Sequence, residues 1–360
     1  MGEERVCQEE FRSCGESLRQ SKDVLEQCRL CPRECGVTRS AGQQGRCRAD
    51  ATVRIARAAL HMWEEPCLSG TEGSGAVFFS GCSLGCIYCQ NHEISGGEAG
   101  LAISIERLAE IFLELQEEGA NNINLVTAGH YIPQVCDALE RSKRQGLSLP
   151  IVYNSSGYEK VESLKCLEGL VDIYLPDLKY LDRELAARYS HAPDYPEYAT
   201  AALAEMVRQQ PKVRFRAKQE SGDIRRLEGD LFGGGEQETG VPGSHQAESG
   251  MQREQVMEKG VIVRHLLLPG HVREAKHVVE YLYRTYGDQI YISLMNQYTP
   301  IRTDFADKNL NRRVTRREYQ RLLDFAVELG VTNGFCQEGA TASESFIPAF
   351  NYEGVLKKEK

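Results

Sequence analysis

From about residue 76 onward, short apolar runs alternate with longer amphipathic stretches. The apolar runs are rich in Val, Ile, Leu, Phe and Tyr and are bounded by turn residues, which is typical of buried strands. They predict six strands, at residues 76–80, 122–126, 151–154, 172–175, 261–267 and 290–294. Strands that alternate with helical patterns indicate a parallel sheet with helical crossovers.

The clearest helical pattern covers residues 104–119. Ile105, Leu108, Phe112 and Leu115 share one face, while Ser104 before it suits an N-cap and the glycine at 119 suits a stop. Further helices are expected after Pro133 and at residues 161–167, 198–209, 273–286 and 316–329. The expected fold is α/β: a partial (β/α)6 TIM-like barrel with an irregular, cysteine-rich N-terminal extension. In such folds the chemistry lies at the carboxyl ends of the strands.

The pattern divides the chain into two parts. Residues 1–75 form the cysteine-rich extension, and residues 76–350 form the core barrel. Residues 218–250 interrupt the core with three consecutive glycines and few apolar residues, so we expect a flexible surface insertion there.

Composition narrows the class of protein. Of 360 residues, 41% are hydrophobic and 26% are charged, which is typical of a soluble globular protein. No apolar run reaches the roughly 18 residues that a membrane-spanning helix needs. The charged N-terminus does not resemble a signal peptide. We therefore expect a cytoplasmic protein without a membrane partner. A net charge of −9 disfavours nucleic acid as a partner.

The cysteines are the residues that indicate a specific chemistry. Ten of the 13 cysteines lie at or before Cys89. In a cytosolic chain of this size, clustered cysteines indicate metal or redox chemistry.

Cys82, Cys86 and Cys89 follow the first predicted strand with the spacing CxxxCxxC. A four-iron, four-sulfide cube takes one thiolate per iron, so three cysteines hold three corners and leave one iron open for a ligand. Gly81 and Gly85 would let the loop backbone approach the sulfides. The alternatives are a zinc loop that borrows a fourth ligand, for which this spacing is unusual, or three packed thiols.

This motif, with Tyr88 before its last cysteine, resembles the radical S-adenosylmethionine (SAM) superfamily. Within it, the chain resembles the glycyl-radical activating enzymes, in particular proteins similar to pyruvate formate-lyase activating enzyme. The segments that carry the resemblance are FFSGC, CQNHEIS, NINLVT, IYLPDLKY, VRHLLLPG and ISLMNQY. The resemblance implies a [4Fe–4S] cluster, SAM as cofactor, and a flavodoxin or ferredoxin as electron donor. It also implies reductive cleavage of SAM to a 5′-deoxyadenosyl radical that abstracts a hydrogen atom from a substrate.

The resemblance also suggests which residues hold SAM. Thr127, with His130 nearby, stands where the family has a Gly-Gly-Glu-Pro segment for the methionine amino group. Asn154 and Ser155 occupy a polar turn that faces the cofactor. Asp177 and Lys179 match an Asp-x-Lys of the family, whose lysine contacts the methionine carboxylate. Arg264 is a charged residue within an apolar strand and therefore needs a partner of opposite charge. A carboxylate ligand would provide this partner.

A second group, Cys28, Cys31, Cys35 and Cys47, supplies four possible ligands. Its spacing fits a zinc site or a second iron–sulfur cluster equally well. The alternative is a small loop-rich lid with reduced thiols.

Three functions follow from these observations. The first is an activating enzyme that makes a glycyl radical in a partner protein. The second is a radical SAM enzyme that modifies a small molecule or another macromolecule. The third is a non-enzymatic iron–sulfur or zinc protein, which the cluster motif disfavours. No catalytic residue beyond the cluster ligands is identified from the sequence.

Overall fold

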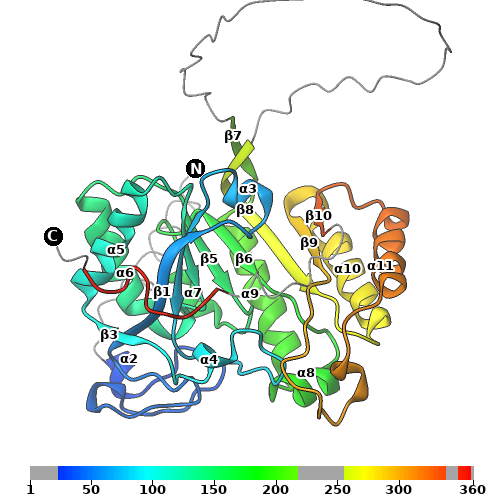
Figure 1. The fold of residues 1–360 in the computed structure, drawn as a ribbon, viewed down its shortest axis with the longest axis horizontal. Coiled ribbons are helices and arrows are strands. Elements are labelled where there is room, and N and C mark those ends of the chain that lie inside the picture. Colours follow the sequence, from blue (N-terminus) through cyan, green and yellow to red (C-terminus); the bar gives the residue numbers. More distant parts are fainter. Residues whose placement is uncertain (1–22, 218–254, 338–347, 358–360) are drawn as a thin grey trace, which may run out of the picture.

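The computed structural model describes residues 23–217, 255–337 and 348–357, and its centre is a curved sheet (Figure 1). Its parallel strands adjoin one another in chain order, which is the order of a (β/α) barrel, whereas a doubly wound sheet reverses its order at a switch point. These strands are β2 (Ser74–Phe79), β4 (Ile123–Val126), β5 (Ile151–Ser155), β6 (Ile173–Pro176), β8 (Gln255–Leu266), β9 (Tyr291–Met295) and β10 (Gly334–Cys336). The α/β half-barrel expected from the sequence is confirmed.

The helices occupy the stretches that the apolar spacing predicts. At the start of the first long helix, the Ser104 side chain accepts a hydrogen bond of 3.1 Å from the Arg107 backbone N–H. Gly119, which follows the end of this helix, has a φ of 88°, in the left-handed region that favours glycine. The longer helices are α5 (Ile105–Glu117), α6 (Ile132–Arg144), α8 (Arg183–Ser190), α9 (Tyr195–Gln209), α10 (Val272–Tyr286) and α11 (Arg316–Leu329). Shorter pieces are α2 (Asp23–Glu26), α3 (Pro66–Ser69), α4 (His92–Ser95), α7 (Val161–Lys165) and the 3-10 turns at Arg39–Ala41, Gly129–Tyr131, Gly287–Gln289 and Lys308–Asn311.

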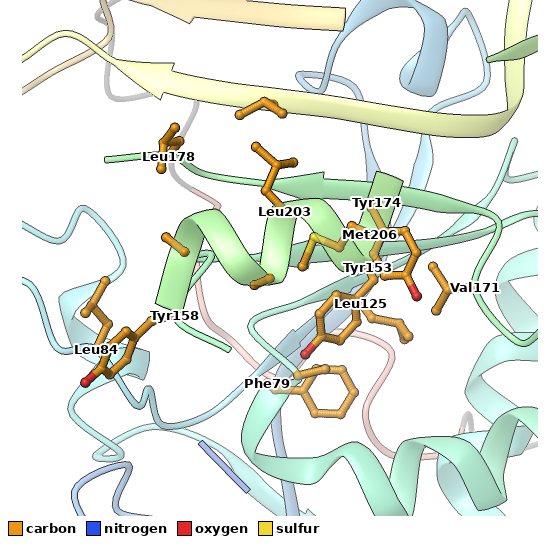
Figure 2. Packing of buried hydrophobic residues seen from close by; sticks show 14 of the residues in the cluster. Phe79, Leu84, Leu125, Tyr153, Tyr158, Val171, Tyr174, Leu178, Leu203 and Met206 are labelled. Atoms are coloured by element: carbon orange, nitrogen blue, oxygen red, sulfur yellow. The ribbon is translucent and has the colours of Figure 1, made fainter. Parts of the chain in front are cut away.

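The two faces of the sheet serve different purposes. Phe79 and Leu125 belong to the main core, which packs against the helices (Figure 2). Phe78 and Val126, one residue away on the same strands, belong to a separate cluster and line the barrel interior. Successive side chains of a strand point to opposite faces of the sheet. Each strand therefore contributes alternate residues to the core under the helices and to the barrel interior.

Residues 53–61 lie in the segment expected to be irregular, but they form β1 (Val53–His61), which pairs antiparallel with β2. The strand is rich in alanine and arginine, so its apolar alternation is weak even though its inward positions are buried. β3 (Leu101–Ile103) pairs with β1, and β7 (Arg214–Ala217) pairs antiparallel with β8. The predicted insertion at 218–250 lies outside the described residues.

The loop after β1, residues 62–70, enters the barrel and is called here the interior loop. Asn122 donates to the Leu68 carbonyl at 2.8 Å, and Asn121 donates to that of Ser69 at 2.6 Å. Leu68 packs with Val152 and other inward residues of the sheet. These contacts close the amino-terminal end of the barrel.

Arg264 on β8 joins the interior loop to the opposite wall of the barrel. Its guanidinium forms ion pairs with the carboxylates of Glu64 and Glu65, the latter at 2.6 Å. Burial opposes ionisation of Glu65, yet Arg264 holds the pKa of this carboxyl below its usual value. Asn124 on β4 donates to Glu64 at 2.9 Å, so one network spans the interior.

Residues 348–357, called here the C-terminal strap, lie against β1. The Ala58 backbone N–H donates to the Glu353 carbonyl at 2.8 Å, and Arg107 of α5 donates to the Val355 carbonyl at 3.0 Å. Phe350 contacts Phe78 edge-on at 5.6 Å between ring centroids. The strap therefore covers part of the open side of the half-barrel.

None of the helices in the described ranges is long and apolar enough to cross a membrane.

The buried network predicts a large stability effect of Arg264→Met. This change leaves Glu64 and Glu65 buried without their counter-charge, which costs about 3–5 kcal/mol. We expect this loss in the free energy of unfolding measured with urea. Arg141→Met, which removes the exposed pair with Asp137, serves as the control and should have a much smaller effect. Equal effects would contradict a structural role for the network.

Candidate active site

A cavity of about 230 Å³ opens at the carboxyl ends of the strands and extends into the barrel. The predicted cluster ligands and all six predicted SAM-contacting residues line it, although they are far apart in the sequence. They are Cys82, Cys86, Cys89, Thr127, Asn154, Ser155, Asp177, Lys179 and Arg264. The topology brings them together because the carboxyl ends of parallel strands meet at one edge of the sheet.

The loop that carries the three cysteines is anchored on both sides. Tyr88 is buried, and its hydroxyl lies 2.5 Å from that of Tyr180. Gln90 donates to the Gln297 carbonyl after β9 at 2.6 Å. These contacts fix the cysteine loop between β6 and the last strands of the barrel.

The three thiols are partly exposed to the cavity, and their surroundings favour ligation. Burial raises the pKa of Cys86 to about 12, which opposes formation of the thiolate that a metal binds, and Lys179 acts against this rise. The Ser190 hydroxyl donates to Cys86 Sγ at 3.0 Å. Such a hydrogen bond also stabilises a thiolate, and hydrogen bonds to the sulfurs help to set the reduction potential of an iron–sulfur cluster.

The donor set fits a polynuclear cluster better than one metal ion. In the described part of the chain, no three His, Cys, Asp or Glu side chains converge as ligands of a single ion would. In a cube each thiolate binds a different iron, so its cysteines lie farther apart than zinc ligands. Three cysteines on the wall of one cavity satisfy this requirement and leave a fourth corner open to the cavity.

Gly81 lies against the N-terminal segment. A Cβ at this position would lie 2.3 Å from the Cys47 carbonyl oxygen. A Cβ at Gly85 would be in ordinary contact with the Arg46 guanidinium, at 3.4 Å. The missing side chain of Gly81 therefore allows the N-terminal segment to pack against the cysteine loop.

Thr127 ends β4 with a φ of 63°. This conformation is rare for a β-branched residue, and such strain persists at positions that the surrounding structure enforces. The Thr127 backbone N–H donates to the Asn154 carbonyl at 2.9 Å. His130 does not line the cavity: it is buried, its Nε2 donates to the Ser80 carbonyl at 2.8 Å, and burial lowers its pKa to about 4.

Asp177 and Lys179 form an ion pair of 2.6 Å at the end of β6. Burial opposes the charge of Lys179, but Asp177 and its other neighbours hold the lysine pKa well above its ordinary value. The Asn154 side chain lies on the neighbouring strand. This part of the wall therefore offers a fixed cation, an anion and an amide within one cavity.

Ser155 lines the cavity, but its hydroxyl is already engaged. It donates to Glu159 Oε1 at 2.7 Å and accepts from the Gly157 N–H at 3.1 Å. Burial raises the pKa of Glu159 to about 7, and its Oε2 has no hydrogen-bond partner among the residues that the structure describes. The Ser155 hydroxyl thus supports the turn, and Ser156, which sequence reasoning did not select, also lines the cavity.

Arg264 reaches the cavity wall, but its guanidinium is paired with Glu64 and Glu65 of the same chain. The partner that its burial requires is therefore internal, and not a carboxylate ligand as the sequence suggested. Sequence reasoning also missed His61, Trp63 and Glu64, which line the cavity. The only signal for them was a pair of acidic residues before a proline, in a stretch taken as irregular.

Comparisons with known proteins give a family, a relative and a solved structure to which this chain is similar. Residues 76–213 match the Radical SAM superfamily. The chain is similar to an uncharacterized protein of Methanocaldococcus jannaschii, with 24% identity over 313 residues that cover 85% of this chain and 76% of the relative. Its fold was also compared with the crystal structure of Streptococcus suis SuiB bound to S-adenosylmethionine. The TM-score is 0.43 at 10% identity, over 73% of this chain and half the length of SuiB.

The matched region begins within β2 and includes the three cysteines as well as the Asp177–Lys179 pair. The similarity to the Radical SAM superfamily therefore covers the strands and loops that carry these residues.

Proposed function

We propose that this protein is a radical SAM enzyme that reductively cleaves S-adenosylmethionine and abstracts a hydrogen atom from a substrate. The observation that carries the proposal is one cavity in which Cys82, Cys86 and Cys89 face the Asp177–Lys179 pair and Asn154. It lies largely within the region that is similar to the Radical SAM superfamily.

In this proposal the three cysteines hold a [4Fe–4S] cluster by three of its irons. A cluster held there would supply the single electron, taken from a flavodoxin- or ferredoxin-type donor, that cleaves the sulfonium C–S bond of SAM to methionine and the 5′-deoxyadenosyl radical. The protein's own residues orient SAM and exclude water and stray hydrogen donors from the cavity.

The wall of the cavity supplies groups for each polar part of SAM. Lys179 pairs with the methionine carboxylate as a point charge. The backbone at Thr127, held in its unusual conformation, takes the position of the family's segment for the methionine amino group. Asn154 provides both a donor and an acceptor for the ribose hydroxyls or the carboxylate.

For the substrate, we propose a glycine in a partner protein. The mouth of the cavity includes Trp63, which is 56% exposed, and the neighbouring Met62 is 45% exposed. Exposed apolar side chains beside a cavity suit contact with a polypeptide. The resemblance to activating enzymes supports the same class of substrate, and a small-molecule substrate is the other outcome of the test below.

The first test is product formation. After anaerobic reconstitution with iron and sulfide and chemical reduction, the native protein should convert SAM to 5′-deoxyadenosine, measured by chromatography. The variant with Cys82, Cys86 and Cys89 changed to alanine should form none. Cys336→Ala, which changes an exposed cysteine that does not line the cavity, is the control and should behave as the native protein. Equal product from the triple variant would exclude the proposed cluster site.

The second test concerns Lys179. Because a hydrogen bond to a charged group contributes about 1.5–3 kcal/mol, Lys179→Met should weaken SAM binding by about tenfold to a hundredfold. Binding would be measured calorimetrically on the reconstituted protein. Lys160→Met removes a similar pair, with Glu34 at 2.6 Å, which does not line the cavity. Unchanged affinity in Lys179→Met, or the same loss in both variants, would argue against the assigned contact.

The third test identifies the substrate class. A candidate partner protein with α-deuterated glycine should transfer deuterium to 5′-deoxyadenosine, which mass spectrometry detects, and should acquire a glycyl radical signal. Partner protein with deuterium only on alanine is the control. If deuterium instead arrives from a small molecule and from no glycine-labelled partner, the activating-enzyme proposal is incorrect while SAM cleavage stands.

A further inference from the structure

The four cysteines of the N-terminal segment lie in one folded unit. The Cys28 N–H donates to the Val37 carbonyl at 3.1 Å, and the Gly36 N–H donates back to the Cys28 carbonyl at 2.9 Å. These two bonds bring the ends of the first loop together, so Cys28 lies opposite Gly36 and Val37, which directly follow Cys35. A turn closed by the Glu34 N–H on the Cys31 carbonyl, at 3.1 Å, places Cys31 within the same loop.

Cys47 completes the group from a second loop. The Cys35 sulfur packs against Gly45, where a Cβ would lie only 2.4 Å from it. The next turn, closed by the Arg48 N–H on the Gly45 carbonyl at 3.0 Å, places Cys47 next to this contact. All four thiols are free; Cys28, Cys31 and Cys47 are buried, and Cys35 is exposed.

The charges of residues 28–48 suit a group of thiolates. This stretch carries arginines at 29, 33, 39, 46 and 48 and one acidic residue, Glu34, and nearby positive charge favours thiolates.

The geometry also distinguishes between the two kinds of metal site that four cysteines can form. Zinc requires all four sulfurs at about 2.3 Å from one point. Within the described ranges, no three ligand-type side chains converge in this way. A cube does not require such convergence, because each of its cysteines binds a separate iron.

We propose that Cys28, Cys31, Cys35 and Cys47 hold a second iron–sulfur cluster, with a cysteine on every iron. Four ligands close this site, unlike the three-cysteine site in the cavity, so it suits electron transfer or structure and not SAM binding. The proposal concerns separate residues and does not depend on the proposed function.

The second site lies directly beside the first. The Cys47 carbonyl packs against Gly81, which precedes Cys82. Arg33 donates to the carbonyls of Ser83 at 3.0 Å and Leu84 at 3.2 Å, within the cysteine loop of the cavity. Two reduced clusters at such a short separation interact magnetically, which gives the proposal a spectroscopic signature.

The test compares metal content in matched variants of the full chain after anaerobic reconstitution with iron and sulfide in the presence of zinc. If each site holds a four-iron cube, the native protein should bind about eight irons per chain. The variant with Cys82, Cys86 and Cys89 changed to alanine should keep about four, and so should the variant with Cys28, Cys31, Cys35 and Cys47 changed to serine. Cys336→Ala should bind as much as the native protein.

The alanine variant decides the outcome even if the serine variant fails to fold, because it leaves the N-terminal site intact. Iron and acid-labile sulfide retained there, together with a broadened electron paramagnetic resonance spectrum in the fully reduced native protein only, would support the second cluster. An alanine variant that binds about one zinc, or no metal, would overturn it. A native protein that binds eight irons yet produces no 5′-deoxyadenosine would refute the proposed function and not this site.

Discussion

The guanidinium of Arg264 is the group on which the interior of this half-barrel depends. A buried cation needs a partner, and the chain supplies two carboxylates, Glu64 and Glu65, from a loop that must enter the barrel to reach it. That loop closes the amino-terminal end of the barrel through Asn121 and Asn122, and it brings Trp63 to the cavity. The cysteines lie at the other end of the cavity wall, at the carboxyl ends of the strands.

Sequence patterns were sufficient for the elements that repeat regularly. All six predicted strands and the long helices are present, because buried parallel strands are continuous apolar runs and the helices bury one face each. From the strand ends the sequence also identified Thr127, Asn154, Asp177 and Lys179 as neighbours of the three cysteines, since topology alone brings such positions together.

Features set by tertiary contacts were not predictable in the same way. β1 has too weak an alternation to be recognised before its partner β2 is known, and the partner of Arg264 lies about two hundred residues away in the sequence. The contact between Gly81 and the Cys47 carbonyl was not predictable because the two residues come from different segments. The hydroxyl of Ser155 was expected to face a ligand, but the buried Glu159 binds it.

The proposed function requires that the iron left without a cysteine, in a cluster held by Cys82, Cys86 and Cys89, binds SAM directly. The most direct measurement is electron–nuclear double resonance on the reduced, reconstituted protein with SAM that carries isotope labels in its amino and carboxylate groups. We predict hyperfine coupling of both labels to the unpaired electron of the cluster. A cluster that forms and is reduced, but shows no coupling to either label when SAM is bound, would contradict the central claim.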